Sequence, residues 1–234
     1  TRLGKDRGFA FVQRHVSVTA ARRIKELDLE GIGIVKESRR FYPHKELAAH
    51  LLGYVGIDND GLAGLESSFD GEIRGRPGRS LVQVDARRRP FSRVERPPTA
   101  GSSLELSIDM YLQYIAEREL RATVLEHGAS GGSVVVMEPA TGEILALANE
   151  PSFNPNRFAN FPAESRRNRA TQDVYEPGST FKIVTASAAL EEQVFHPDHV
   201  FDVSPGFIRF GARRVEDIGN YGSLSFTDVL VKSS

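Results

Sequence analysis

A serine and a lysine three residues apart, Ser179 and Lys182, could carry out nucleophilic chemistry. Residues i and i+3 of a helix lie about 5–6 Å apart at Cβ, so the lysine amine can reach the serine hydroxyl. A serine hydroxyl is a poor nucleophile until a base removes its proton, and a buried lysine can be that base. A helix N-terminus at this point would add free N–H groups that stabilise an oxyanion. The pair therefore predicts attack on a carbonyl by Ser179.

The spacing alone is weak evidence, because a serine and a lysine at this distance occur about once by chance in a chain of this length. The alternative is a serine that caps a helix, with a solvated lysine. The context favours the nucleophile, since Ser179 follows Pro177 and Gly178 and begins a helix with apolar residues. It also ends a long aperiodic stretch at residues 150–178, and such loops are usually functional or disordered.

Composition and charge exclude several classes of protein. The 234 residues carry a formal net charge of -1 and are 40% hydrophobic, which is typical of a globular chain with one or two domains. A balanced charge gives no electrostatic argument for nucleic acid as a partner. The absence of cysteine excludes disulfides, zinc fingers and thiol catalysis. No stretch approaches the roughly 18 apolar residues of a membrane helix, so any anchor is expected outside this chain.

A polar, proline-bearing segment without periodicity at residues 87–102 predicts a linker between two structural units. Ahead of it, residues 17–28 have the apolar spacing of a surface helix, which Ser17 could cap. Residues 45–53 predict a short helix, and residues 56–64 predict a glycine-bearing loop.

Beyond the linker the pattern changes to longer elements. Residues 104–108 predict a strand, and Asp109 can cap a long helix that Gly128 ends. Two apolar strands at residues 133–138 and 143–149, joined by PATG, predict a hairpin. These elements precede the aperiodic stretch that leads to Ser179.

Two other groups of residues invite a chemical interpretation. His196 and His199 could bind a metal, but the proline between them argues against one helical face and no third ligand is evident. Glu66 and Asp70 share a helical face, where two carboxylates are more often solvated than an acid/base pair. We favour solvated surface for both and expect no metal and no cofactor.

The segment EPGSTFK around Ser179 closely resembles the active-site segment of the class B penicillin-binding proteins, the D,D-transpeptidases of bacterial cell-wall synthesis. RRFYP, AAHLLGYVG, GLAGLESSFD and GRPG resemble the N-terminal pedestal module of that family. SIDMYLQ, GGSVVVMEPATGEILALANEPSFNPN and NRATQDVYEPGS resemble its transpeptidase domain up to the nucleophile. VLVKSS resembles the approach to its second motif, S-x-N, so the matches cover nearly the whole chain in the order of the family.

The resemblance implies the fold class and the domain organisation. Residues 1–102 would form an α+β pedestal, a dimerisation-like module with its linker at about 87–102. Residues 103–234 would form the N-terminal part of a penicillin-recognising α/β domain with an antiparallel sheet. The sequence lacks the asparagine of S-x-N and the K-[ST]-G motif, which forms one wall of the cleft in the family. We therefore expect a portion of a longer chain, inactive as it stands.

The resemblance also implies roles for particular residues. Ser179 would attack the D-Ala-D-Ala carbonyl of a peptidoglycan stem peptide, with Lys182 as its general base. Ser233 would be the first residue of S-x-N and would relay a proton to the leaving amine. Three further residues would contact the substrate: Ser234, Glu176 and Arg169. This mechanism requires no metal and no cofactor.

The implied function is a serine D,D-transpeptidase that cross-links stem peptides and is inhibited by β-lactams. RRFYP and GLAGLE favour the septal division type over the elongation type. Two alternatives stay open: a D,D-carboxypeptidase or β-lactamase on the same scaffold, and a non-catalytic penicillin-binding scaffold or sensor. Because stem peptides lie outside the cytoplasmic membrane, we expect a membrane-anchored periplasmic or extracellular protein with glycosyltransferase and divisome partners.

Overall fold

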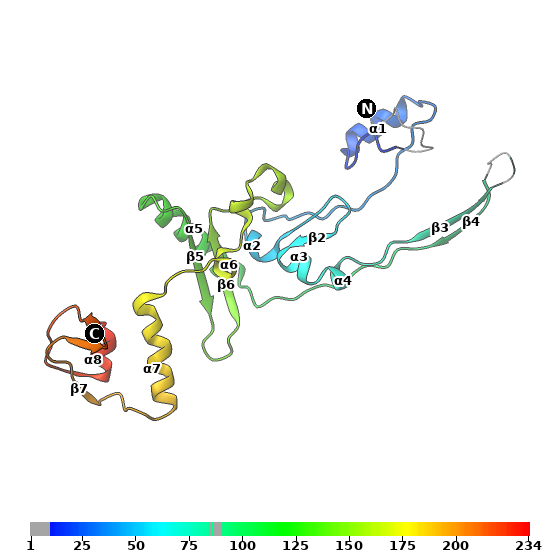
Figure 1. Ribbon diagram of the computed structural model, residues 1–234. Coiled ribbons are helices and arrows are strands. Elements are labelled where there is room, and N and C mark those ends of the chain that lie inside the picture. Colours follow the sequence, from blue (N-terminus) through cyan, green and yellow to red (C-terminus); the bar gives the residue numbers. More distant parts are fainter. Residues whose placement is uncertain (1–9, 85, 87–89) are drawn as a thin grey trace. The chain divides into compact units, whose positions relative to one another are not determined.

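The computed structural model describes residues 10–84, 86 and 90–234, which form two compact units. One unit ends at Asp173 and the other runs from Val174 to Ser234 (Figure 1). Within the described ranges, no helix is both long and apolar enough to span a bilayer.

The first described element is helix α1 (Val18–Glu26), which the sequence predicts over residues 17–28. Ser17 Oγ accepts a hydrogen bond from the Ala20 amide at 3.1 Å, so the predicted N-cap is confirmed. None of the residues of α1 is buried, which agrees with the predicted surface helix.

The centre of the first unit consists of short elements around a small hairpin. Strand β1 (Tyr54–Val55) pairs antiparallel with β2 (Gly61–Ala63), where the sequence predicts only a loop over residues 56–64. The approach of the hairpin to the next helix requires glycine, because a Cβ on Gly61 would lie 1.9 Å from the Glu66 carbonyl oxygen. The helices around the hairpin are α2 (Ala49–Leu52), α3 (Gly64–Ser68) and α4 (Asp70–Ile73).

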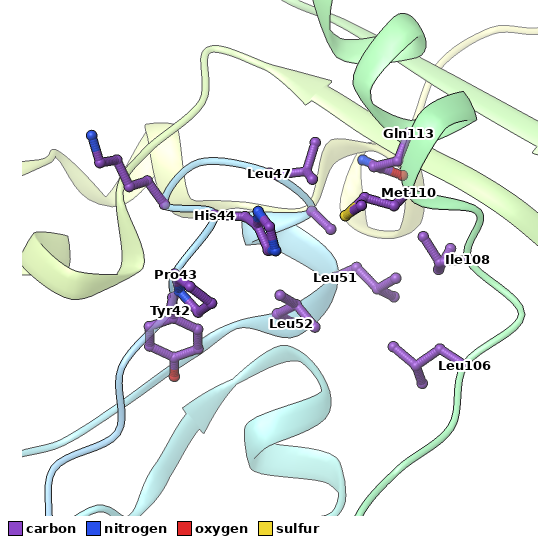
Figure 2. A pocket seen from close by; sticks show the side chains of 12 residues that line it. Tyr42, Pro43, His44, Leu47, Leu51, Leu52, Leu106, Ile108, Met110 and Gln113 are labelled. Carbon is purple, nitrogen blue, oxygen red and sulfur yellow. The ribbon is translucent and has the colours of Figure 1, made fainter.

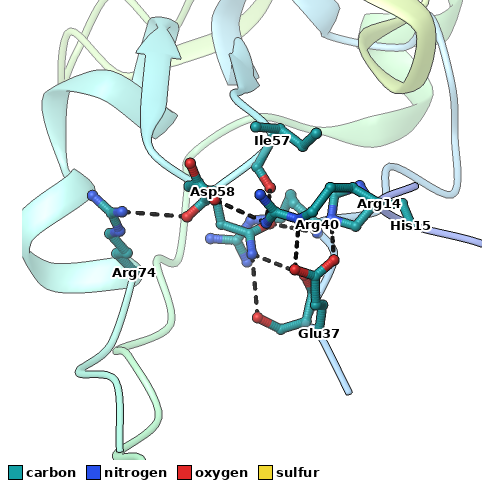
Figure 3. A network of polar contacts seen from close by, with 9 residues as sticks. Arg14, His15, Glu37, Arg40, Ile57, Asp58 and Arg74 are labelled. Atoms are coloured by element: carbon teal, nitrogen blue, oxygen red, sulfur yellow. Dashed lines mark hydrogen bonds and ion pairs between the residues drawn. The ribbon is translucent and has the colours of Figure 1, made fainter. Parts of the chain in front are cut away.

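A network of polar contacts holds the loop between β1 and β2 (Figure 3). Arg14 pairs with Glu37 at 2.6 Å and with Asp58 at 2.8 Å, so the segment before α1 is joined to this loop. Arg74 donates to the main-chain oxygen of Asp58 at 3.2 Å from α4. The network therefore holds this loop to the segment before α1 and to the end of α4.

Strand β3 (Arg79–Val84) pairs antiparallel with β4 (Pro90–Arg96), in a register that places Leu81 opposite Val94. The sequence predicts an irregular linker over residues 87–102, and this is wrong for Pro90–Arg96; residues 87–89 lie outside the described residues. Leu81 and Val94 are 65% and 59% exposed, so this facing pair of apolar side chains lies in solvent and not in a core. The boundary that we place near residue 102 stays a prediction.

The core of the first unit lies between one long helix and one hairpin. Asp109 caps helix α5 (Met110–Glu126) by accepting from the amides of Tyr111 at 2.9 Å and Leu112 at 2.8 Å. Strands β5 (Gly132–Met137) and β6 (Ile144–Glu150) pair antiparallel, so the predicted helix and hairpin are confirmed. Small side chains let the helix approach the sheet closely, and the buried cluster consists of Ala116, Leu120, Ala146 and Ala148.

The strand predicted at residues 104–108 is wrong. This segment lies beside the start of β6 but forms no regular strand pairing with it. Ser107 Oγ donates to the Ile144 carbonyl at 2.8 Å, and the Asp109 amide donates to the Leu145 carbonyl at 2.9 Å. Two of the alternating apolar residues, Leu106 and Ile108, line an apolar pocket instead of taking part in strand pairing.

Gln113 joins α5 to β6 from a fully buried position, with 0% exposure. Its amide accepts from the Leu147 N–H at 2.7 Å and donates to the Leu147 carbonyl at 2.9 Å. It also donates to Glu117 at 2.7 Å, and burial raises the pKa of that carboxyl group.

We expect Gln113→Leu to lower the free energy of unfolding by about 3 kcal/mol, because both main-chain groups of Leu147 lose their partner in a buried place. Urea denaturation measures the loss, and Gln172→Leu, in the loop before Asp173, is the control. A loss below about 1 kcal/mol would contradict this account of Gln113.

The loop between β6 and Asp173 folds into short helices. They are η2 (Pro155–Asn160), η3 (Ala163–Arg166) and α6 (Arg169–Gln172). The sequence predicts a long stretch without periodicity here. Each of these helices is at most six residues long, which is too short to produce a helical pattern of apolar residues.

We call residues 42–54 the clasp, because hydrogen bonds and ring contacts join this segment to the loop between β6 and Asp173. The Asn156 side chain accepts from the Tyr42 amide at 3.0 Å and donates to the Tyr42 carbonyl at 2.8 Å. Phe153, which is 1% exposed, meets the His50 ring edge-on with centroids 5.2 Å apart. The clasp therefore joins residues that are 114 positions apart in the sequence.

The clasp contains a histidine that should make stability depend on pH. His50 is 7% exposed and donates from Nε2 to the Ser165 carbonyl at 2.9 Å; burial lowers the pKa of His50. Because the folded pKa is below the unfolded value of about 6.5, the unfolded chain binds the proton first as the pH falls. Stability is therefore full above about pH 6.5 and decreases below it, by at most about 1.4 kcal/mol per pH unit.

We expect the wild type to lose more stability than His50→Gln between about pH 7.5 and pH 5.5, measured by urea denaturation at each pH. His44→Gln is the matched control, because His44 is exposed. Equal pH dependence in the wild type and His50→Gln would show that His50 does not titrate on unfolding.

Residues of the clasp line one side of an apolar pocket of about 210 Å³ in the first unit (Figure 2). Leucines of the clasp face Ile108 and Met110 across it, and the Gln113 side chain lies at its edge. All the residues that line this pocket belong to the unit that ends at Asp173, so Ser179 is not among them.

The second unit combines short helical elements with two antiparallel strand pairs, of which one is a hairpin. Its helical elements are the 3-10 turn η4 (Gly178–Phe181), α7 (Lys182–Glu191) and α8 (Phe226–Val231). Strand β7 (Val200–Asp202) pairs with β10 (Ser223–Ser225), and β8 (Phe207–Phe210) pairs with β9 (Arg213–Glu216). Aromatic rings pack beside β7, with the centroids of Phe195 and Phe201 4.9 Å apart.

Candidate active site

Ser179 lies in η4, the turn that leads directly into α7. Pro177 fixes the backbone before the turn, and Gly178 has a φ of +54°, which glycine adopts without strain. Thr180 closes the turn by donating from its hydroxyl to the Pro177 carbonyl at 2.5 Å. The Pro-Gly pair thus places Ser179 at the N-terminal end of a helical segment, as the sequence predicts.

Three side chains of the second unit form a hydrogen-bonded series. Lys182 Nζ donates to Ser233 Oγ at 2.9 Å, and Ser233 Oγ lies 2.8 Å from Ser179 Oγ. Lys182 also donates to the main-chain oxygens of Ser233 and Ser234. The spacing predicts that the lysine reaches Ser179 directly, whereas the hydrogen bonds in this structure connect the two through Ser233. A proton leaving Ser179 therefore has a path to the Lys182 amine through one hydroxyl.

Ser233 owes its position to the way in which α8 ends. The Ser233 amide donates to the Leu230 carbonyl at 3.2 Å and the Ser234 amide donates to the Val229 carbonyl at 3.0 Å, which is the Schellman pattern. The residue at the left-handed position of this motif is usually glycine, but here Ser233 has a φ of +55°. A non-glycine residue there costs roughly 1 kcal/mol, and such strain is concentrated at functional sites.

The three residues predicted to bind substrate lie in different surroundings. Ser234 Oγ donates to the carboxylate of Asp217, so this hydroxyl already has a protein partner. Glu176 is exposed and precedes Ser179 by three residues. Arg169 belongs to the other unit, where its Nη1 pairs with Asp173 at 3.0 Å. Ser234 is next to Ser233 in the second unit, whereas Arg169 and Ser179 belong to different units. All three roles stay predictions.

Asp217 is the residue of this site that sequence reasoning missed. It follows β9 by one position and precedes Ser234 by 17, without periodicity or motif to connect the two. Its acidic side chain in the segment before VLVKSS is a signal, but an acidic residue in a loop is too common to identify its partner.

The two histidines weighed as metal ligands have other contacts. His196 Nδ1 lies 3.5 Å from Asp198 Oδ2, and the His199 ring meets Phe201 edge-on with centroids 4.8 Å apart. Among the described residues, no three histidine or acidic side chains are grouped so that they could hold a metal ion.

Comparisons with known protein families cover most of the chain. Residues 6–106 match the penicillin-binding protein dimerisation domain, and residues 132–234 match the penicillin binding protein transpeptidase domain. The chain is 40% identical over 227 residues to the peptidoglycan D,D-transpeptidase FtsI of Escherichia coli K12, covering 97% of this chain and 38% of that protein. It is 37% identical to the probable peptidoglycan D,D-transpeptidase PbpC of Pseudomonas aeruginosa, covering 97% of this chain and 40% of that protein.

Solved structures give the same result. Penicillin binding protein 3 of Mycobacterium tuberculosis, also solved with aztreonam, matches with a TM-score of 0.69 and 33% identity, over 84% of this chain and 41% of that one. A peptidoglycan synthetase from Bifidobacterium adolescentis matches with a TM-score of 0.72 and 26% identity, over 94% of this chain and 40% of that one.

The chain thus spans about two fifths of the length of the curated relatives it matches. The matches confirm the predicted fold class, an α+β module followed by transpeptidase-domain sequence with antiparallel strand pairing. Because a dimerisation-domain match precedes a transpeptidase-domain match along this chain, and its relatives include a D,D-transpeptidase at 40% identity, the chain belongs to the class B penicillin-binding proteins, as its motifs predict.

Proposed function

We propose that this chain supplies the nucleophile of a serine D,D-transpeptidase that cross-links peptidoglycan stem peptides. The observation that carries the proposal is the hydrogen-bonded series from Ser179 through Ser233 to Lys182 at the start of α7. The names of relatives support the reaction class, since FtsI and PbpC are described as a D,D-transpeptidase and a probable one.

In the first step, Ser179 Oγ attacks the carbonyl carbon of the penultimate D-Ala. Its proton passes to Ser233, whose own proton passes to the neutral Lys182 amine, so that a tetrahedral oxyanion forms. The helix N-terminus stabilises this charge through its free N–H groups. When the C–N bond breaks, Ser233 donates its proton to the departing D-Ala amine and receives one from Lys182, so that Lys182 is neutral again. An acyl group stays on Ser179.

In the second step, the amine of a neighbouring stem peptide attacks the acyl group, and the protons move along the same series in reverse. A new amide forms and Ser179 is released. Water in place of the amine would make the enzyme a carboxypeptidase. A β-lactam follows only the first step, because its leaving nitrogen stays attached to the acyl group and blocks the second.

We assign substrate contacts to Ser234, Glu176 and Arg169. Support for Glu176 is its exposure three residues before the nucleophile. Support for Ser234 is its position directly after Ser233, whose hydroxyl lies 2.8 Å from Ser179 Oγ. The two-domain organisation, with the pedestal up to about residue 102, is part of the same proposal and is supported by the dimerisation-domain match over residues 6–106.

The cellular setting is also proposed. Stem peptides occur outside the cytoplasmic membrane, so the protein acts in the periplasm or outside the cell, held by an anchor beyond this chain. A septal division role, with glycosyltransferase and divisome partners, is supported by the similarity to FtsI over 97% of this chain.

The deciding experiment is the intact mass of the full-length protein before and after incubation with a β-lactam. A stable increase of one drug mass supports the transpeptidase. Consumption of the drug without an adduct would favour a carboxypeptidase or β-lactamase, and neither adduct nor turnover would leave a non-catalytic scaffold.

A further inference from the structure

Two exposed arginines face each other on the hairpin of β8 and β9. The register places Arg209 directly opposite Arg214, and Phe207 lies two positions before Arg209 on the same face. Side chains that are directly opposite in an antiparallel pair have Cβ atoms about 4.5–5.5 Å apart, and like charges in these positions are destabilising. The pair therefore weakens the hairpin unless a negative group lies near both arginines.

The ring of Phe207 brings the two guanidinium groups together. Arg214 Cζ lies 4.0 Å from the centroid of this ring, and Arg209 Cζ lies 6.0 Å from it. A guanidinium group that stacks on an aromatic face loses side-chain freedom, while the N–H groups at its edge stay able to donate. The ring is half-buried and is therefore a platform that holds both groups over one face of the hairpin.

The negative charge on this face balances only one of the two arginines. Glu216 lies opposite Phe207 and pairs through Oε1 with Arg214 Nε at 2.9 Å. Among the residues that the structure describes, none forms an ion pair with Arg209. A carboxylate can accept two parallel N–H bonds from one guanidinium group. A carboxylate from a ligand therefore suits this face, because it offsets the repulsion between the two arginines.

The hairpin leads to the reacting groups of the same unit. Strand β9 runs into Asp217, whose carboxylate accepts from the hydroxyl of Ser234. The Asp217 amide donates to the Gly206 carbonyl at 2.8 Å and so closes the base of the hairpin. Arg214 precedes Asp217 by three residues, which is about 10 Å of extended strand. Because a peptide extends by at most about 3.5 Å per residue, the pair suits a group several residues from a scissile bond at Ser179.

We propose that Arg209 and Arg214 form a subsite for a carboxylate of the stem peptide, which they bind over the ring of Phe207. The inference rests on the proposed function, because the peptide that reacts at Ser179 supplies the carboxylate. This carboxylate is not the one at the D-Ala terminus, which lies one residue from the scissile bond. The subsite selects peptides that carry an acidic residue at a set distance from this bond, in the acyl donor or in the acyl acceptor.

The test uses synthetic peptides and the full-length protein. In the donor arm, peptide thioesters carry one acidic residue at varied positions before the reacting carbonyl, or the matching amide at the same position. Ser179 takes the acyl group, the thiol leaves, and the increase in intact mass over time gives the second-order acylation constant. We expect the carboxylate to be preferred about tenfold at the best position, because charge-assisted hydrogen bonds are the stronger kind.

The acceptor arm measures which peptide amine takes the acyl group from Ser179. Acceptor peptides with the same pairs of acidic and amide side chains compete with water, and the ratio of transfer to hydrolysis is recorded. A preference of about tenfold in this arm alone would assign the subsite to the acceptor, and a preference in the donor arm alone would assign it to the donor.

Four variants separate binding from folding. Arg209→Gln and Arg214→Gln should each bring the preference close to one. Arg213→Gln is the matched control and should keep the preference, because Arg213 lies on the opposite face of the same hairpin. Arg209→Glu places an acidic side chain opposite Arg214, so it should remove the preference and raise the melting temperature at low salt. A more stable protein that has lost its selectivity cannot be explained by misfolding.

The proposal is overturned if the wild type shows no preference for the carboxylate in either arm, including the case in which it reacts with neither peptide. It is also overturned if the preference survives in Arg209→Gln and Arg214→Gln, or if Arg213→Gln loses it equally. Acylation by a β-lactam separates these results from a failure of the proposed function. An adduct that Ser179→Ala does not form leaves that function intact, whereas a wild type without an adduct overturns both.

Discussion

The Ser179→Ala variant is expected to form no covalent adduct with a β-lactam, whereas the wild type gains one drug mass. Alanine lacks the oxygen that forms the ester bond, and the remaining series of Ser233 and Lys182 has no acyl acceptor at the start of α7. We expect the acylation rate constant to fall by at least about 10³-fold, as for other serine nucleophiles. Intact-mass spectra recorded over time measure it.

The matched control for this prediction is Ser187→Ala, since Ser187 is an exposed serine of the same helix. It should be acylated at the wild-type rate. An adduct on Ser179→Ala, located by peptide mapping, would identify another nucleophile and contradict the assignment.

The second large effect is expected at Ser233, where stability and activity should change in opposite directions. Ser233→Gly removes the strain of the left-handed conformation, so the free energy of unfolding should rise by up to about 1 kcal/mol. It also removes the hydroxyl between Ser179 and Lys182, so the acylation constant should fall by about 10²-fold or more. Thermal unfolding and β-lactam acylation measure the two effects.

Ser233→Ala is the matched variant, because it loses the hydroxyl but keeps the strained conformation. It should lose acylation as Ser233→Gly does and be the less stable of the two, by about 1 kcal/mol. If both variants have the same stability, the strain attributed to Ser233 is absent. If either keeps the wild-type acylation constant, the relay through Ser233 is wrong.

The elements that the sequence predicts well are those whose signals are local. The caps at Ser17 and Asp109, the helix α5 and the β5–β6 hairpin follow from neighbouring residues and a clear period. Ser179 and Lys182 are singled out by their spacing and by motifs of a known family, and the structure places both at the predicted start of a helical segment.

The elements that it predicts poorly depend on distant partners. Pro90–Arg96 shows no alternation of apolar residues. It forms a strand because it pairs antiparallel with Arg79–Val84. Residues 104–108 have the alternation but find no ladder. The bond between Asp217 and Ser234 depends on how β9 and α8 end, which a one-dimensional pattern does not contain.

The clasp has a consequence for synthesis on the ribosome. Tyr42 bonds to Asn156, which lies 114 positions later, so the N-terminal module leaves the ribosome long before its partner loop exists. At about 5–20 residues per second, this interval lasts roughly 6–23 s. During this time Tyr42 lacks its hydrogen-bond partner in the loop that follows β6. His50 likewise lacks the Ser165 carbonyl and the Phe153 ring that it contacts in the folded unit. This part of the first unit is thus completed only after the loop that follows β6 has been synthesised.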